Sequence, residues 1–152
     1  MVKKTASSNY YESIGKRKEA VARIRLYVVT GKDKTITVNG LKIKQGEIFV
    51  NKKPIETVFP SKAQKTQYLK PLKLVKAEDR FAVSALLKGG GLSGQLDAFV
   101  HGLARALEKT DKETLRPILK KENLLTRDSR IKERRKVGTG GKARRKKQSP
   151  KR

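Results

Sequence analysis

The sequence contains no cysteine, no tryptophan and a single histidine, His101. Without cysteine the chain can form neither disulfides nor cysteine zinc sites, and one histidine cannot build a histidine-rich metal cluster. No apolar run is long enough to span a bilayer, and the basic stretches lack the apolar face of an interfacial helix. These absences disfavour a metal or a membrane as a partner, and we expect no cofactor.

Acidic residues are also scarce. Asp and Glu number 14 against 39 Lys and Arg, which gives the 152-residue chain a net charge of +25. A compact fold of this charge repels itself unless a polyanion neutralises it, so nucleic acid is the favoured partner and an anionic membrane the weaker alternative. The polar segment from Met1 to Tyr11 has no apolar centre and does not resemble a secretory signal, so we expect a cytoplasmic protein.

The positive charge is concentrated towards the C-terminus. Residues 1–129 hold 27 basic and 13 acidic residues, whereas residues 130–152 hold 12 basic residues and one acid, Glu133. This last segment has few large apolar residues and several glycines, so it cannot bury enough surface to order itself. We expect a flexible N-terminus at 1–9, one globular domain at 10–129, and a basic tail at 130–152 that is disordered until bound.

The first strand pattern lies at residues 20–28, where apolar residues occupy alternate positions. Arg17, Arg23 and Arg25 share the other parity, which predicts a sheet with one apolar and one basic face. Exposed charge is usually just solvated. Here few acids are available to neutralise the cations, whereas phosphates would do so and would release counterions on binding, so we favour contact with nucleic acid.

A hairpin is predicted in the segment 34–45. Strand-like runs at 35–38 and 41–43 are separated by Asn39-Gly40, a dipeptide that tolerates the positive φ angles of a tight turn. A further strand-like run follows at 47–50. It resembles the first run at a spacing of twelve residues, although short β segments often look alike by chance.

Helices alternate with the later strands. Ser61 and Gln64 have capping-box spacing, which predicts a helix at 62–70 that ends before Pro71 because the residue preceding proline avoids the α region. The other expected elements are strands at 72–75 and 80–86, a helix capped by Ser93, and a shorter helix capped by Asp111. The helix after Ser93 has an apolar stripe made of Leu96, Phe99, Val100, Leu103, Ala104 and Leu107. The order of elements indicates an α+β fold, a mixed sheet packed by helices.

A glycine-rich loop, Lys88-Gly89-Gly90-Gly91, precedes that helix. Such a loop can present free backbone N–H groups to a phosphate, but it lacks the residues of a nucleotide-binding P-loop or of a dinucleotide fingerprint. The glycines could equally serve only to make a tight connection. His101, on the same helix, has no partner arranged for acid-base catalysis in the sequence, so we expect a polar or RNA-facing contact instead.

Several segments resemble the universal small-subunit ribosomal protein nine family, in its bacterial form. They are Tyr10-Tyr11 with Gly15 to Ile24, the loop Gly89 to Gln95, the helix segment His101 to Leu107, and Leu124 to Arg130 with the basic tail that ends in Lys151-Arg152. The resemblance extends from Tyr10 to Arg152. It implies a domain like the second domain of small-subunit protein five, placed on 16S rRNA in the subunit head beside neighbouring head proteins.

The resemblance also implies a role for the basic tail. The tail would run through the rRNA, and its last residues, Lys151 and Arg152, would approach the anticodon stem-loop of the P-site tRNA. The residues expected to bind rRNA are Lys16, Arg17, Lys18, Arg23, Arg25, Lys88, Gly89, Gly90, Arg127, Arg130, Arg134, Arg135, Lys136, Lys142, Arg144, Arg145, Lys146 and Lys147. Two features depart from the family pattern: Ser149-Pro150 replaces an aromatic residue and serine, and the hairpin at 34–45 is additional.

The reading favoured by these observations is a structural rRNA-binding protein of the small subunit that performs no reaction and takes no small-molecule substrate. One rival is a nucleoid or RNA-chaperone protein that uses the same charge without specific placement. A second rival is a small phosphotransferase, since glycine loops precede helices in kinases of a related fold. It rests on analogy alone and lacks a convincing acid near the loop.

Overall fold

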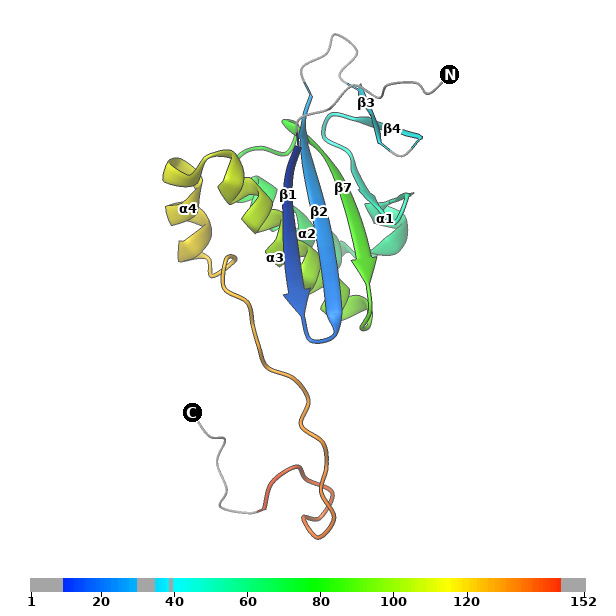
Figure 1. The fold of residues 1–152 in the computed structure, drawn as a ribbon, viewed down its shortest axis with the longest axis vertical. Helices are drawn as coiled ribbons and strands as arrows, with labels where there is room; N and C mark the ends of the chain where they lie inside the picture. The colour runs from blue at the N-terminus through cyan, green and yellow to red at the C-terminus, as the bar shows by residue number, and fades with distance from the viewer. Residues whose placement is uncertain (1–9, 30–34, 39, 146–152) are drawn as a thin grey trace.

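A mixed β-sheet with helices packed against one of its faces forms the body of the protein (Figure 1). The structure, a computed structural model, describes residues 10–29, 35–38 and 40–145. Its strands are β1 (Tyr10–Arg17), β2 (Ala20–Val28), β3 (Thr35–Val38), β4 (Leu41–Lys44), β5 (Ile48–Val50), β6 (Lys53–Pro54) and β7 (Phe81–Lys88). Its helices are α1 (Ile55–Val58), α2 (Lys62–Leu74), α3 (Leu92–Thr110) and α4 (Lys112–Lys121).

The five-stranded sheet has the order β1-β2-β7-β5-β6. Strands β1, β2 and β7 are antiparallel neighbours, whereas β5 pairs with β7 in parallel. The sheet is therefore mixed, as the predicted α+β class requires. Strand β1 forms one edge of this sheet and the two-residue strand β6 forms the other.

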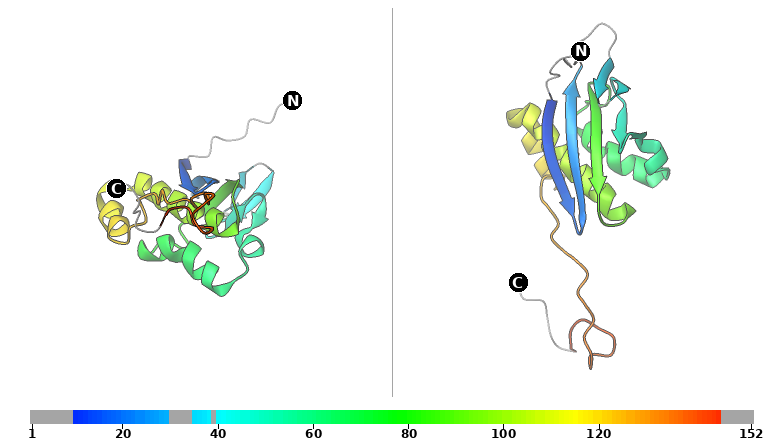
Figure 2. Two further views of the ribbon diagram at one scale, coloured as in Figure 1. Left: turned by 90° about the horizontal axis from the view of Figure 1, so that it is seen from below. Right: turned by 45° about the vertical axis from the view of Figure 1, so that its right-hand side comes forward.

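Helices α2 and α3 lie on the same side of the sheet, which we call the helix face; the opposite side is the open face (Figure 2). Alternate residues of β2 from Ala20 to Leu26 point to the helix face and are buried, among them Ile24, which is fully enclosed, whereas Val28 at the end of the strand is exposed. Arg23 is exposed on the open face. Period-two alternation therefore gave the two faces of β2 correctly.

The prediction that Arg17 shares a face of the sheet with Arg23 and Arg25 was wrong. The chain turns at Lys18 and Glu19, so Arg17 belongs to β1 and pairs in register with Ala20, a helix-face residue. Lys18 has a positive φ of 50° in this turn. Because directly opposed residues in a sheet point to the same side, Arg17 faces the helices rather than sharing a face with Arg23.

Helix α3 crosses β1 at very short range. A Cβ atom added at Gly15 would lie 2.0 Å from the carbonyl oxygen of Ala98, and one at Gly102 would lie 2.8 Å from Ile24 Cγ1. The Ser13 hydroxyl donates a hydrogen bond of 2.6 Å to the Gly102 carbonyl in this buried contact. Two glycines on facing elements thus let the backbones approach and position α3 on the sheet.

Two element boundaries differ from the prediction around Pro71. Helix α2 continues through Pro71 to Leu74, so the strand expected at 72–75 is wrong. Proline removes one backbone donor and disfavours the α conformation before it. Here Pro71 and Leu72 are both buried, and we attribute the extra turn to that burial outweighing the local preference.

The starts of the other helices agree with the sequence in part. Asp111 caps α4, since its carboxylate accepts a hydrogen bond of 3.2 Å from Thr114 N, and α4 continues through Pro117. Helix α3 instead begins two residues earlier than expected: its N-cap is Gly91, and Ser93 lies inside the helix. The predicted apolar stripe of α3 is buried throughout.

The predicted hairpin is present as β3 and β4 and packs on the open face. Val38 and Ile43 of the hairpin are buried with Tyr27 and Ala82 of the main sheet in a second, small core. Gly40 has the positive φ expected of the turn, 81°, whereas Asn39 lies outside the described residues. The hairpin therefore covers one end of the open face and leaves the other end uncovered.

Beyond α4 the described chain, up to Arg145, contains no helix or strand and extends away from the sheet (Figure 1). The expected flexible N-terminus, residues 1–9, lies outside the described residues, as do Lys146, Lys147, Pro150, Lys151 and Arg152. Among the helices that the structure describes, none has the length and apolar character needed to cross a bilayer.

Candidate nucleic-acid interface

Four cations gather at the uncovered end of the open face: Lys16, Lys18, Arg23 and Lys88, which we call the basic patch. Register brings Lys16 and Lys88 to either side of Val21, and Arg23 lies between Ile14 and Leu86 in the neighbouring row. All four are exposed, and within the described part of the chain none of them forms an ion pair with an acid. Their charge is therefore available to an external anion.

Arg25 differs from the basic patch although it lies on the same face. Its Nε donates a hydrogen bond of 2.7 Å to Glu12 Oε2, and its guanidinium lies 5.0 Å from the ring centroid of Tyr10. The Tyr10 ring lies 5.4 Å from that of Tyr27, which is buried with the hairpin at the covered end of the open face. Arg25 is thus engaged within the domain.

Arg17 fastens the chain beyond α4 to the sheet. Its guanidinium lies 3.1 Å from an Asp128 carboxylate oxygen and 3.6 Å from one of Asp97 on α3, and it donates a 2.6 Å hydrogen bond to the Arg130 carbonyl. Its side chain is only 15% exposed. Hydrogen bonds from Arg130, helped by the charge of Arg17, hold the pKa of Asp128 well below its usual range. Arg17 therefore positions residues 128–130.

The glycine loop is required by close packing. A Cβ at Gly89 would lie 2.5 Å from the Glu19 carbonyl oxygen, and both Gly89 and Gly90 have positive φ angles, 72° and 61°. The Gln95 side chain donates a 3.0 Å hydrogen bond to the Gly89 carbonyl. These contacts explain the glycines as a connection. The first turn of α3 that follows has no side-chain cap, which leaves backbone N–H groups there for an anion.

The free edge of β1 is met by three side chains spaced four residues apart on α3. Arg105 donates to the Ile14 carbonyl at 2.5 Å, and Lys109 donates to the Glu12 carbonyl at 2.6 Å. His101 Nδ1 lies 3.3 Å from the backbone N of Lys16, which donates to it. An edge strand normally exposes these groups for pairing. Here two carbonyls and one N–H of the edge are engaged by α3 side chains that lie along it, which hinders the pairing of another strand with β1.

His101 bridges β1 to the chain after α4 and is not a free RNA-facing group. Its Nε2 lies 3.2 Å from the Leu125 carbonyl, so the neutral ring that donates from Nε2 and accepts at Nδ1 satisfies both contacts. Burial lowers the pKa of His101, and the nearby charges of Arg105 and Arg127 lower it further, whereas the Leu125 carbonyl opposes the shift. The ring is therefore held in its neutral form.

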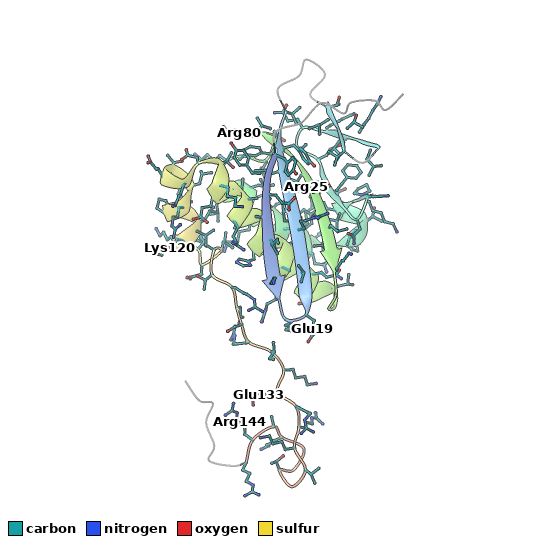
Figure 3. All side chains as sticks on the ribbon, viewed as in Figure 1. Glu19, Arg25, Arg80, Lys120, Glu133 and Arg144 are labelled. Atoms are coloured by element: carbon teal, nitrogen blue, oxygen red, sulfur yellow. The ribbon has the colours of Figure 1, made fainter. Side chains whose placement is uncertain are left out.

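The expected tail residues fall into four groups. Arg127, Arg130, Arg134, Arg135, Lys136 and Lys142 are exposed. Arg144 forms an ion pair of 2.5 Å with Glu133 that closes a loop in the chain (Figure 3). Within this loop, the Thr139 hydroxyl donates a hydrogen bond of 2.6 Å to the Lys136 carbonyl and also contacts the Lys142 carbonyl. Arg145 is exposed and is not without a partner. The remaining expected residues, Lys146, Lys147, Lys151 and Arg152, lie outside the described part.

Sequence reasoning missed the residues that join the domain to the segment beyond α4. Neither the ion pairs of Arg17 nor the edge contacts of Arg105 and Lys109 were anticipated, because each joins residues about 80 to 110 positions apart. The spacing 101, 105, 109 was visible as a polar stripe on one side of α3. Within the described residues, no group of three or more histidine, aspartate or glutamate side chains is placed to hold a metal ion.

Comparisons with known proteins agree with the motifs. A family model described as ribosomal protein S9/S16 matches residues 15–152. The chain is 45% identical over 135 residues to small ribosomal subunit protein uS9 of Maridesulfovibrio salexigens, covering 89% of this chain and 92% of that protein. It is 40% identical over 149 residues to the uS9 protein of Rickettsia felis, covering 98% and 82%. The chain therefore belongs to the ribosomal protein S9 family and is a structural, non-enzymatic component of the small ribosomal subunit.

Proposed function

We propose that this protein binds 16S rRNA in the head of the small subunit through the basic patch and the segment beyond α4, and that Lys151 and Arg152 reach the P-site tRNA. The observation that carries the rRNA proposal is the basic patch, in which four exposed cations lie together without an acidic partner among the described residues. Phosphates would neutralise these cations and release counterions.

Two neighbouring features support the same surface. The turn that holds Lys18 contacts the glycine loop, so the uncapped first turn of α3 lies beside the basic patch. Arg17 holds residues 128–130 against the same end of the sheet, which starts the tail from a defined position. The basic patch and residues 128–130 would position the RNA, and the tail beyond them would add further phosphate contacts.

The test is a salt titration of the full chain against the head domain of 16S rRNA and against an unrelated folded RNA of equal length. We expect preference for the head domain to persist at high salt, where unspecific phosphate contacts weaken. Replacing Lys16, Arg23 and Lys88 with Gln should reduce that preference. A matched control replaces three exposed lysines outside the proposed surface, Lys62, Lys73 and Lys120, with Gln, and should retain it. Equal binding of both RNAs at every salt concentration would favour the nonspecific chaperone instead.

The tRNA contact is tested separately because its residues lie outside the described chain. In assembled small subunits, replacing Lys151 and Arg152 with Ala should raise the dissociation rate of tRNA from the P site without changing rRNA binding. The matched control replaces Lys146 and Lys147 with Ala, which removes the same charge farther from the end. If both pairs have the same effect, the contribution is only bulk charge, and the terminal assignment is wrong.

A further inference from the structure

An acidic pocket lies at the edge of the sheet opposite β1, in a protein whose charge is otherwise strongly positive. It has a volume of about 470 Å³ and lies between β5, β6, α1, α2 and the turn before β7. Four carboxylates line it, those of Glu47, Glu56, Glu78 and Asp79, and Lys65 is the single cation in the lining. The local charge is therefore opposite in sign to that of the whole chain.

The carboxylates of this acidic pocket are only partly used within the domain. Glu56 pairs with Lys65 Nζ at 2.6 Å, and Glu47 accepts a 2.9 Å hydrogen bond from the backbone of Lys44. Glu78 and Asp79 form no ion pair among the described residues. Lys73, Lys76 and Arg80 share a separate depression with these two acids, yet none of the three bridges to them. Two carboxylates without a partner are unexpected where basic residues greatly outnumber acids.

The hydroxyl of a mostly buried tyrosine offers a second, independent polar group to an occupant of the acidic pocket. Tyr68 is 2% exposed and belongs to the main core, yet it also lines the acidic pocket. Its hydroxyl makes no hydrogen bond within the described chain, and it is not among fully enclosed atoms, so it opens into the pocket. Burial raises the pKa of Tyr68, which keeps the hydroxyl protonated and able to donate or accept. A buried tyrosine hydroxyl normally has such a partner.

We propose that the acidic pocket receives a lysine or arginine side chain from an extended basic segment of a neighbouring protein in the small subunit. The carboxylates would bind the cationic head, and the apolar walls formed by Phe49 and Leu69 would contact its aliphatic stem. An RNA phosphate does not fit, because four carboxylates repel it. This inference goes beyond the proposed function, since it uses no RNA contact and lies on the opposite sheet edge.

The position of the pocket agrees with a protein occupant. Strand β1 and the segment fastened by Arg17 lie at one edge of the sheet, whereas β5 and β6 form the other (Figure 1). An RNA bound at the basic patch, at the Lys88 end of β7, would leave the acidic pocket, which lies beside the turn before Phe81 at the other end of this strand, to other components. The two-residue strand β6 at this edge offers too little backbone for strand addition, so side-chain recognition is the mode that the site supports.

The test places a photo-crosslinking amino acid, benzoylphenylalanine, at Lys65 of the full chain and assembles small subunits with it. Lys65 is exposed at the pocket, and its replacement removes a cation while leaving all four carboxylates. After irradiation, the adduct is digested and sequenced by mass spectrometry. We expect an adduct with one defined peptide of another small-subunit protein that carries Lys or Arg at the crosslinked position. An adduct with RNA, or none, overturns the proposal.

Variants then test the chemistry. Replacing Glu78 and Asp79 with Lys should reduce the adduct at least about tenfold, because the new lysines would repel the cationic side chain of the partner. The matched control, Glu19→Lys with Glu113→Lys, makes the same charge change outside the pocket and should retain the adduct. Tyr68→Phe removes only the hydroxyl and should weaken the adduct without preventing folding, which keeps the test valid if the double variant is unstable. Unchanged adducts in both pocket variants would refute the proposal.

Discussion

Helix α3 lies so close to β1 that two glycines are needed at the contact, whereas the chain beyond α4 is fastened to the same strand by the guanidinium of Arg17. The first contact joins backbones through buried atoms. The second joins side chains at the rim, where Asp128 keeps a third of its surface exposed. Close packing is insensitive to salt, but partly exposed ion pairs are screened by it. The domain and its extension should therefore respond differently to the same perturbation.

The largest expected effect is at the close contact. Gly15→Ala places a Cβ atom 2.0 Å from the Ala98 carbonyl oxygen and 2.4 Å from Gly102 N, so α3 must move off the sheet. We expect a loss of about 3 kcal/mol in the free energy of unfolding, the upper range for overpacking. Urea denaturation measures it. Gly91→Ala is the control, because no atom lies within 4 Å of its Cβ; equal losses in the two variants would contradict the packing argument.

A smaller loss is expected from the hydrogen bond in the same contact. Ser13 is 4% exposed and donates to the Gly102 carbonyl, so Ser13→Ala leaves a buried acceptor without that donor. We expect a cost of roughly 1 to 2 kcal/mol, measured by the same denaturation. Added salt should not change this difference. A difference that shrinks as salt rises would mean that the contact depends on charge.

The sequence was most informative where local pattern and burial agree. The alternation in β2, the stripe of α3 and the Asp111 cap all follow from rules that act over a few residues. The errors arose where a distant contact or an unrecognised turn overrides such rules. Burial of Pro71 and Leu72 extends α2 against a local preference, and the turn at Lys18 moves Arg17 to the other face.

In the candidate interface, too, local features of the sequence predicted some residues correctly and could not predict contacts that depend on the fold. Lys16 and Arg23 were named from their charge and Lys88 from the glycine loop, and register brings the three together at one end of the open face. Charge could not reveal that Arg17 and Arg25 are engaged within the domain, because their partners Asp128 and Glu12 are reached only through the fold. Tertiary pairing, which leaves no periodic trace, separates cations that hold the protein together from those available to phosphate.

Arg17 holds the start of the chain beyond α4, at residues 128–130, against the sheet. Arg17→Gln removes the ion pairs to Asp97 and Asp128, and we expect at most about 1 kcal/mol of lost global stability because these acids are partly exposed. The local effect should be larger: amides of residues 128–130 should exchange hydrogen faster, as measured by mass spectrometry. Arg23→Gln, the same charge change in the basic patch, is the control. If 128–130 exchange equally in both variants, Arg17 does not position the extension.

The smallest expected effect links the two regions through His101, which contacts β1 with one ring nitrogen and Leu125 with the other. Its pKa is lowered in the folded protein, chiefly by burial, so the unfolded chain binds the proton more readily. Stability should thus be complete above the unfolded pKa, near pH 6.5, and should fall as pH drops through that value towards the folded pKa. Protonation also removes the acceptor that Lys16 N–H uses.

Thermal unfolding between pH 7.5 and 5.5 tests this link, with His101→Gln as the reference because its amide keeps a donor and an acceptor but does not titrate. The wild-type protein should lose more stability than the variant across this window, and hydrogen exchange should quicken at Leu124–Thr126 before the core of α3 responds. That order is expected because the rim contact opens without disturbing the glycine contact between α3 and β1. Parallel pH profiles in the two proteins would show that His101 does not couple the domain to its extension.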